Sequence, residues 1–182
     1  MKSLTFNGIR KDWLYLLQGR EKPPFAPIDR RLISVPGMAG AYLSSTSVRP
    51  LLINQPIGVV VHSDAEALQI KEELAEWLFT DKPVELQFDD EPGRTYYAIV
   101  QNTIEDFSKF AEFRTGTIQF LCLDPYSYGS EQTIEPNDDT FIIENNGTAE
   151  AEPIIELTAT QKSTFAMVYR GSSRTESMSG AS

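Results

Sequence analysis

The one cysteine of this 182-residue chain is the side chain that most resembles a catalytic nucleophile. Cys122 lies in the stretch TIQFLCLDPYSYG, residues 117–129, two positions before Asp124. A thiol attacks a substrate as the thiolate, so it needs a base close by, and the single histidine, His62, would have to serve. A hydrolase built on a Cys122–His62 pair is therefore one hypothesis to test.

The residues around Cys122 favour a packing role for the thiol. On a strand, one face would hold Ile118, Phe120 and Cys122, and the other face Gln119, Leu121 and Leu123. Both faces are largely apolar, which predicts a buried strand. A thiol buried among apolar side chains has a raised pKa and forms little thiolate. The pattern thus predicts that Cys122 is inert.

Acidic residues provide the other candidate chemistry. With one histidine and one cysteine, a zinc site of three or four nitrogen and sulfur ligands is excluded. Asp89, Asp90 and Glu91 could bind calcium or act as paired carboxylates, but they precede Pro92-Gly93 and lack the D-x-D-x-D-G spacing of an EF-hand. We interpret them as turn formers with solvated charges. No glycine-rich phosphate loop or G-x-S-x-G motif occurs, so the sequence predicts no catalytic residue, no cofactor, no metal and no enzyme.

The chain is acidic, with 16 Lys and Arg against 26 Asp and Glu and a formal net charge of −10. Proteins bind nucleic acid mainly by neutralising phosphates. The nearest approach to a basic cluster is Arg30-Arg31, a pair more typical of a solvated strand edge or loop. No apolar run approaches the roughly 20 residues that span a bilayer, and the N-terminus lacks the pattern of a signal segment. We expect a soluble protein made in a cytoplasm, without an internal disulfide.

One helix is predicted over residues 63–79. Ser63 and Glu66 have the spacing of a capping box at its start. The apolar residues recur at helical intervals and would form one stripe, comprising Ala67, Ile70, Leu74, Trp77 and Leu78. We expect this stripe to pack on a sheet, with the glutamates solvated on the other side.

The rest of the first 130 residues is predicted to be mainly strand. Residues 58–62, GVVVH, predict a buried strand, and residues 115–123 predict another. Residues 84–88 and 94–100 predict a hairpin, because apolar residues alternate along the first segment before the turn DDEPGR. Residues 43–56 are polar and contain prolines, so we expect a loop or an arm with a weak strand.

Turn signals divide the remaining segments. Pro36-Gly37 predicts a turn in which the glycine supplies a positive φ. Residues 124–139 are expected to be a connector, and 138–170 to begin with two short strands around an Asn146-Gly147 turn. The last twelve residues, 171–182, are rich in serine and glycine and are expected to be disordered.

Five blocks of the sequence, in this order and spacing, resemble the distal tail proteins of long-tailed phages and prophages. They are RRLISVPGMAGAYL, LAEWLFTDKP, LQFDDEPGRTYYAIV, GTIQFLCLDPYSYG and ENNGTAEAEPIIEL, within residues 6–160. The third and fourth blocks are the most specific. The positions that match the family pattern are Pro36, Gly37, Trp77, Leu78, Phe88, Asp89, Asp90, Glu91, Pro92, Tyr96, Tyr97, Gly116, Phe120, Cys122, Asp124, Pro125, Tyr126 and Gly147.

The resemblance implies a structural protein with a mainly β fold related to tail-tube subunits. Residues 1–130 would be a ring-forming N-terminal β-sandwich domain that contains the helix and the hairpin. Residues 131–170 would be the first strands of a galectin-like β-sandwich, and residues 171–182 a disordered tail. Members of the family form a hexameric ring at the distal end of the tail.

The resemblance also implies partners and a location. The ring lies between the tube of major tail protein and the tail-tip protein that leads to host recognition, and in some phages it holds receptor-binding proteins. The chain would assemble in the cytoplasm of the bacterial host and reside in the virion, with DNA only in transit and no membrane contact. Each subunit of a closed ring needs two different complementary surfaces, and residues 43–56 and 89–93 are the expected extensions. Six copies would carry about −60, so we expect a channel that does not hold DNA.

The C-terminal part departs from the family pattern. A galectin-like domain needs about 100 residues to close its two-sheet core, so residues 131–170 predict an incomplete one. Either the chain is truncated or these strands pack back onto the ring domain. The alternative function is a carbohydrate-binding module of a phage or cell-wall system. A coplanar exposed cluster of Tyr126, Tyr128 and Tyr169 would favour that module, whereas the two tryptophans lie in apolar runs that predict burial.

Overall fold

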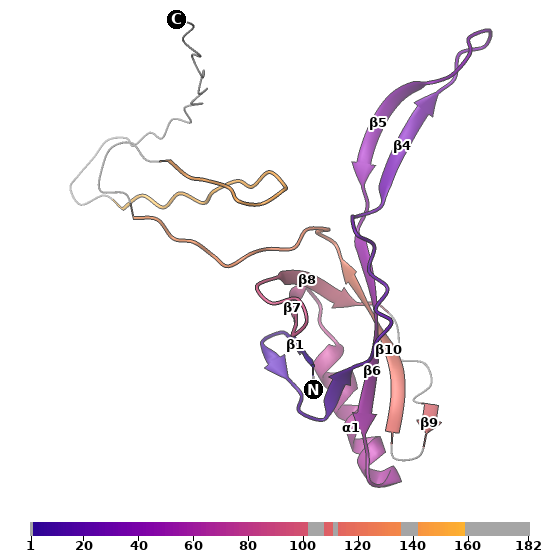
Figure 1. The fold of residues 1–182 in the computed structure, drawn as a ribbon, viewed down its shortest axis with the longest axis vertical. Coiled ribbons are helices and arrows are strands. Elements are labelled where there is room, and N and C mark those ends of the chain that lie inside the picture. The colour runs from indigo at the N-terminus through magenta and orange to yellow at the C-terminus, as the bar shows by residue number, and fades with distance from the viewer. Residues whose placement is uncertain (1, 102–107, 111–112, 136–141, 159–182) are drawn as a thin grey trace, which may run out of the picture. The chain divides into compact units, whose positions relative to one another are not determined.

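The computed structural model describes residues 2–101, 108–110, 113–135 and 142–158 (Figure 1). The chain divides into two compact units, residues 1–149 and residues 150–182. The helix and all the strands of the described residues belong to the first unit. In the second unit, the described residues 150–158 contain no helix or strand.

The first unit is built on an antiparallel sheet in the order β2-β1-β7-β8-β10-β6-β3, with β9 paired to β10. Its strands are β1 (Leu4–Phe6), β2 (Ile9–Arg10), β3 (Leu14–Leu16), β6 (Leu51–Val60), β7 (Val84–Phe88), β8 (Thr95–Val100), β9 (Ser108–Phe110) and β10 (Phe113–Cys122). The sheet curls until its end strand β3 returns to β1, where the Leu16 N–H donates to the Lys2 carbonyl at 2.9 Å. The mainly β fold with one helix and a hairpin, expected from the sequence, is confirmed.

The helix α1 (Asp64–Leu78) begins and packs as its sequence predicts. The Ser63 hydroxyl accepts a hydrogen bond from the Glu66 N–H at 3.1 Å, and the Glu66 carboxylate accepts one from the His62 N–H at 2.7 Å. The buried residues of the helix are the five of the predicted stripe, Ala67, Ile70, Leu74, Trp77 and Leu78. The Trp77 indole donates to the Phe6 carbonyl at 3.0 Å, which satisfies its one polar group inside the core.

The hydrophobic core lies inside the curled sheet and under α1. The rings of Phe6 on β1 and Phe88 on β7 both contact Phe120 on β10, with centroid distances of 5.6 Å and 6.2 Å. These contacts join the two halves of the sheet face to face. Trp77 meets Phe6 edge-on at 6.1 Å, so the helix closes the same core.

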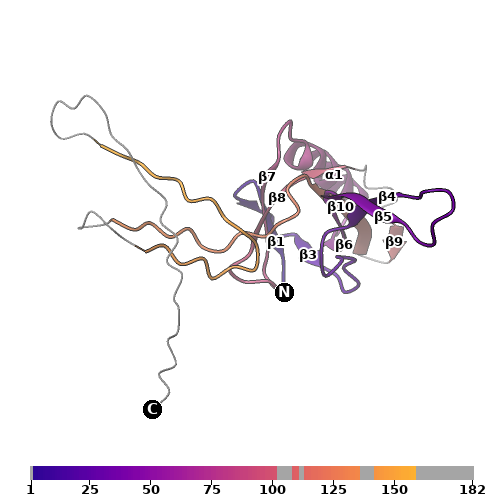
Figure 2. The same cartoon turned by 90° about the horizontal axis from the view of Figure 1, so that it is seen from above.

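Strands β4 (Ile28–Ile33) and β5 (Tyr42–Val48) form a separate two-stranded sheet that projects from the first unit in both views of the ribbon (Figures 1 and 2). We call residues 28–48 the arm. A loop or an arm with a weak strand was expected within residues 43–56. The arm and its strand are confirmed for residues 43–48, which belong to β5, but the expectation is wrong for residues 51–56. Residues 51–60 form β6, a central strand paired with β10 along its whole length. The strand was not predicted from the sequence because Asn54, Gln55 and Pro56 are not typical of a central strand.

Residues 108–110 form β9, which pairs with β10; residues 102–107 and 111–112 lie outside the described residues. One expectation for the C-terminal part differs from the structure. The two short strands expected around Asn146-Gly147 are absent from residues 142–158; residues 136–141 and 159–182 lie outside the description. The Gly147 N–H instead donates to the Asn145 side chain at 2.8 Å. A two-stranded hairpin without a third strand or a helix to pack on is marginal in water, which accounts for the difference.

Candidate interaction site

The tip of the arm is a tight turn surrounded by apolar side chains. The Met38 N–H donates to the Val35 carbonyl at 3.1 Å, and Gly37 has φ of 86°. With Pro36 at the second position and a left-handed glycine at the third, this is the signature of a type II turn. The turn predicted at Pro36-Gly37 is therefore confirmed.

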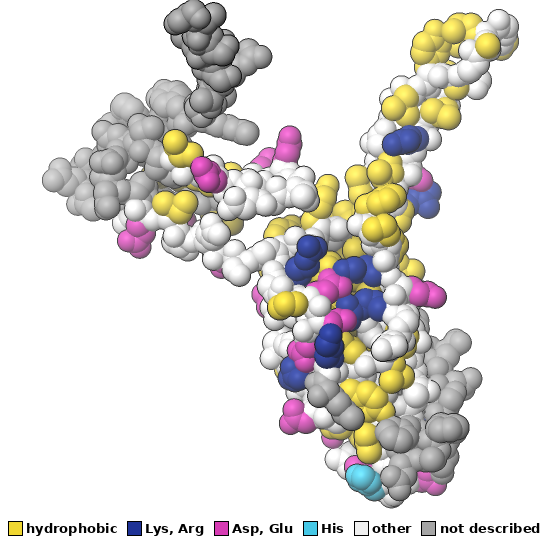
Figure 3. Space-filling view, viewed as in Figure 1, with side chains coloured by type: hydrophobic (Ala, Val, Ile, Leu, Met, Phe, Trp, Pro, Cys, Tyr) yellow, Lys and Arg dark blue, Asp and Glu magenta, His cyan; other side chains and the backbone are white. Residues whose placement is uncertain are grey.

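The arm exposes large apolar side chains along its length, as the space-filling view shows (Figure 3). Its register pairs Ile28 with Val48 at the base and Leu32 with Leu43 near the tip. The exposed apolar residues are Ile28, Leu32, Ile33, Val35, Met38, Tyr42, Leu43 and Val48, with exposed fractions of 42–60%. An isolated hairpin is only marginally stable, and a contiguous apolar surface of this kind marks a site of protein contact.

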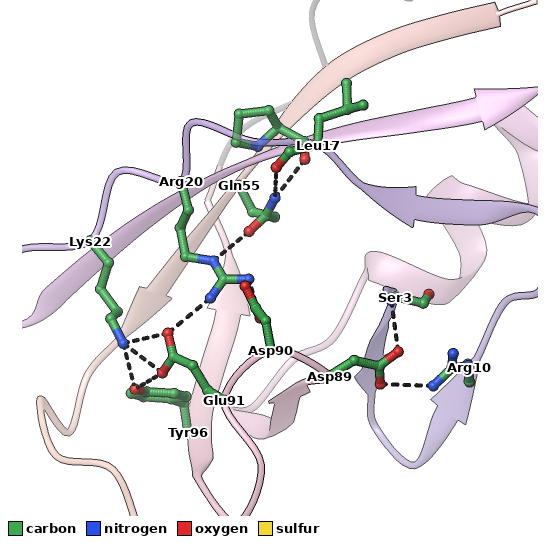
Figure 4. A network of polar contacts seen from close by, with 11 residues as sticks. Ser3, Arg10, Leu17, Arg20, Lys22, Gln55, Asp89, Asp90, Glu91 and Tyr96 are labelled. Atoms are coloured by element: carbon green, nitrogen blue, oxygen red, sulfur yellow. Dashed lines mark hydrogen bonds and ion pairs between the residues drawn. The ribbon is translucent and has the colours of Figure 1, made fainter. Parts of the chain in front are cut away.

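Two of the three adjacent acids, Asp90 and Glu91, anchor the segment that leads into the arm (Figure 4). The Arg20 guanidinium donates to Glu91 at 2.8 Å and to Asp90 at 2.7 Å, and it lies 3.9 Å from the centre of the Phe88 ring. The Lys22 ammonium is 2.6 Å from both carboxylate oxygens of Glu91. The turn between β7 and β8 thus holds residues 20–22, immediately before the prolines that precede β4.

A buried amide connects this ion-pair network to the central strand. Gln55 on β6 is fully buried and accepts a hydrogen bond from Arg20. Its amide group donates to the carbonyls of Leu17 and Pro56 at 3.2 Å and 2.6 Å. Because every polar group of this side chain has a partner, its burial does not carry the cost of an unpaired amide. The base of the arm is therefore fixed to both the hairpin and the middle of the sheet.

The first of the three acids binds the N-terminal strands. Asp89 accepts from the Ser3 N–H at 2.8 Å and from Arg10 at 2.8 Å, and its own N–H donates to the Ser3 carbonyl at 3.1 Å. The interpretation of Asp89, Asp90 and Glu91 as turn formers with solvated charges is therefore wrong in its second part. The turn is there, but each carboxylate has a cationic partner that lies about 70 to 80 positions away in the sequence.

These contacts shift the pKa values of the groups involved. Burial alone would raise the pKa of Glu91, but the hydrogen bonds from Lys22 and Tyr96 outweigh it, so the pKa lies below the ordinary value. Burial would also raise the pKa of Asp89, and the Ser3 N–H and Arg10 bring it below the ordinary value. Burial would lower the pKa of Lys22, but its bonds to Glu91 and Tyr96 raise it. All three groups are thus held in their charged forms.

The candidate nucleophile is a core residue. Cys122 is fully buried, and burial, with a smaller contribution from the Asp124 charge, raises the pKa of its thiol to about 11. His62 is exposed just before α1. Among the described residues, no three or more His, Cys, Asp or Glu side chains form a group that could hold a metal ion. In the same ranges, no helix is long and apolar enough to cross a membrane.

Tyr126 and Tyr128, two of the three tyrosines that could form a sugar-binding platform, are exposed. The Tyr97 and Tyr128 rings meet edge to face, with 5.5 Å between centroids and an angle of 76° between planes. The Tyr128 hydroxyl donates to the Asp124 carboxylate, and this contact raises the pKa of Tyr128. The Tyr126 N–H donates to the same carboxylate at 3.2 Å. Tyr169 lies outside the described residues. Trp77 is buried and Trp13 is partly buried against the core, so neither presents a free stacking surface.

Most positions of the family pattern fall into four structural groups. Trp77, Leu78, Phe88, Tyr96, Phe120 and Cys122 are core residues. Pro36 and Gly37 form the tip of the arm, and Asp89, Asp90, Glu91 and Pro92 lie in the turn before β8. Asp124, Pro125 and Tyr126 follow the end of β10, and Tyr97 on β8 contacts Tyr128 there; Gly116 is within β10, and Gly147 lies in the C-terminal segment. The residues that sequence reasoning missed are Arg20, Lys22 and Gln55, for which no local motif provides a signal.

A curled antiparallel sheet with one helix and a projecting apolar hairpin defines the class: a mainly β domain with an arm suited to contact another protein. Residues 10–122 match the model of the phage tail protein RIFT-related domain. The chain therefore belongs to this family of phage tail proteins, and its resemblance to siphophage distal tail proteins is confirmed.

Two relatives come from one phage. The distal tail protein of Bacillus phage SPP1 is 36% identical over 78 residues, which cover 43% of this chain and 30% of that protein. A crystal structure of SPP1 Dit (gp 19.1), described as a paradigm of the hub adsorption apparatus in phages that infect Gram-positive bacteria, superimposes with a TM-score of 0.63. The two chains are 23% identical in that alignment, which covers 71% of this chain and 53% of the other. At this identity, the superposition shows that the two proteins share a fold. The chain thus spans between 30% and 53% of the length of these relatives.

Proposed function

We propose that the chain is a structural subunit of the tail hub, forming a hexameric ring that joins the tail tube to the host-recognition apparatus and lets DNA pass. The arm is the observation that carries this proposal. It exposes an apolar surface that its own body leaves uncovered, and a second copy of the chain can cover it in a ring. The family membership and the hub description of the SPP1 relative support the same role.

The anchored base suits the arm for assembly. A ring closes only if each head-to-tail contact repeats the same rotation, so the projecting element must leave the body at a fixed angle. Arg20, Lys22 and Gln55 fix the chain immediately before the arm. A preorganised arm loses less conformational freedom on binding than a mobile one, which strengthens the contact.

The proposed ring has tail components on both sides and DNA within it. We expect the major tail tube protein on one side and the tail-tip protein on the other, with receptor-binding proteins as further partners, in a virion assembled in the host cytoplasm. The formal net charge of −10 per copy would repel the DNA phosphates from the channel wall during passage.

Light scattering of the purified chain over a range of concentrations tests the proposal. We expect a discrete species with six times the mass of the chain. The double variant Leu32→Asp/Leu43→Asp should remain a monomer, because it places charges on the apolar face of the arm without touching the core. The matched control is Ile9→Asp, which changes another exposed apolar side chain, on β2, and should assemble normally. A wild-type chain that stays monomeric at every concentration would contradict ring formation.

A further inference from the structure

The solvent side of α1 carries a second apolar stripe. Surface helices of globular proteins normally present polar side chains to water, yet Leu68 is 60% exposed and Phe79, at the C-terminal cap, is 79% exposed. The exposed residues that follow one another at spacings of three and four are Ala65, Leu68, Glu72, Ala75 and Phe79. They lie opposite the five buried residues of the helix, so the helix has an apolar stripe on each side.

The small residues of this outer stripe leave room for a partner to approach. Along this line of the helix, Ala65 precedes Leu68, and Glu72 and Ala75 lie between Leu68 and Phe79. Large side chains separated by alanines create a surface with projections and shallow depressions, onto which apolar side chains of another element can pack. Nothing within the described part of the first unit covers Leu68 or Phe79.

The charges of the arm and of α1 are opposite. Glu72 lies in the outer stripe and Glu76 borders it, both are exposed, and within the described ranges neither has an ion-pair partner. The arm carries Arg30 and Arg31, which are exposed and likewise have no ion-pair partner in the described residues. The one acid of the arm, Asp29, is paired with Arg49 just beyond it. The arm therefore combines an apolar tip with two available cations, and α1 combines an apolar stripe with two available carboxylates.

The arm of one chain is directed away from α1 of the same chain. β6 runs from the base of the arm to the start of the helix, and its ten residues span about 33 Å. The arm continues β6 at one end and α1 begins near the other (Figure 1). A contact between these complementary surfaces thus requires two molecules.

We infer that the outer stripe of α1 is the surface that receives the arm of a second copy of this chain. The apolar residues of the arm would pack on Leu68 and Phe79. Arg30 and Arg31 are consecutive on β4 and point to opposite faces, so one of them would face Glu72 and Glu76. This inference rests on the proposed function, to which it adds the recipient surface. It also supplies the two different complementary surfaces that each subunit of a closed ring must present.

A charge exchange between the two surfaces tests the inference by light scattering. The variants Arg30→Glu/Arg31→Glu and Glu72→Arg/Glu76→Arg should each raise the concentration needed for assembly by about tenfold or more, because like charges then face each other. Combining all four changes in one chain should restore assembly. The matched control is Asp81→Arg/Glu85→Arg, which makes the same change in charge at exposed positions outside the stripe and should have little effect. Circular dichroism verifies that every variant is folded.

Cross-linking provides a second readout that does not depend on charge. A Leu43→Cys chain mixed with a Leu68→Cys chain should form a disulfide-linked heterodimer under mild oxidation, while the buried Cys122 stays unreactive. Gln87→Cys in place of Leu68→Cys is the control and should give no such product. Normal assembly of both double charge variants, with no arm-to-helix cross-link, would overturn the inference and leave the ring intact. A wild-type chain that does not self-associate would contradict the proposed function itself, and the inference with it.

Discussion

The Lys22 ammonium and the Glu91 carboxylate form a two-pronged ion pair, with 2.6 Å from the nitrogen to each oxygen. The Tyr96 hydroxyl completes the group, donating to Glu91 at 2.7 Å and lying 2.9 Å from Lys22. This contact connects the segment before the arm to the hairpin of β7 and β8. Together with the ion pairs of Asp89 and Asp90, this contact anchors the turn between β7 and β8, and its contribution to stability can be measured.

Replacing Glu91 by glutamine should destabilise the first unit. The change keeps the shape of the side chain but leaves Lys22 and Arg20 without their shared carboxylate in a partly buried site. We expect the free energy of unfolding to fall by about 1–3 kcal/mol. Chemical denaturation followed by circular dichroism measures the difference. Glu85→Gln, an exposed position on the neighbouring strand β7, is the control and should stay within about 0.5 kcal/mol of the wild type. A Glu91→Gln protein as stable as this control would show that the ion pairs of Glu91 do not contribute to the free energy of unfolding.

The same anchor should make stability depend on pH in the acid range. The pKa of Glu91 in the folded protein lies below its ordinary value of 4.5, so the carboxylate contributes stability above that value and loses it as the pH falls through the folded-state pKa. Asp89 acts in the same direction below its ordinary value of 3.8. The difference in unfolding free energy between wild type and Glu91→Gln should therefore shrink as the solution is acidified below pH 4.5. A difference that stays constant across this range would exclude the linkage.

The sequence predicted those features whose signals are local. Ser63 and Glu66 fix the start of α1 because their spacing alone forms the cap, and the stripe of α1 follows from helical periodicity. Cys122 could be placed in the core because apolar residues flank it on both faces of one strand. In each case a few neighbouring residues determine the outcome.

The features that the sequence did not reveal depend on distant partners. The partners of Glu91 lie 71 and 69 positions earlier in the chain, so its ion pairs have no local pattern. Gln55 looked like a loop residue because a buried amide is costly, and only the bonds from Arg20 and to Leu17 and Pro56 remove that cost. The exposure of the apolar residues on the arm also depends on distant parts of the chain. The residue pattern of a strand does not reveal whether the rest of the protein covers it.

A close approach between two strands gives a prediction at Gly58. Tyr15 lies opposite Gly58 in the pairing of β3 with β6, and a Cβ atom added to Gly58 would be 2.4 Å from a ring carbon of Tyr15. We expect Gly58→Ala to cost about 1–3 kcal/mol of unfolding free energy, because the ring must move. Gly129→Ala, where an added Cβ meets nothing within 4 Å, is the control.

A double-mutant cycle identifies the cause of that cost. In a Tyr15→Ser background the ring is gone, so Gly58→Ala should cost much less than in the wild type. An undiminished cost in this background would mean that the backbone at Gly58, and not the ring, resists the alanine.

The thiol of Cys122 should be unreactive in the folded protein. With its pKa raised to about 11, the thiol is almost entirely protonated at neutral pH, and its complete burial excludes reagents as well. Iodoacetamide added to the native chain should therefore leave it unlabelled in mass spectrometry, whereas the same treatment in denaturant should add one label. The denatured sample is the control, since it proves that the thiol is free and the reagent active. Rapid labelling of native protein at neutral pH would revive the hypothesis of a Cys122-dependent hydrolase, which the buried position now opposes.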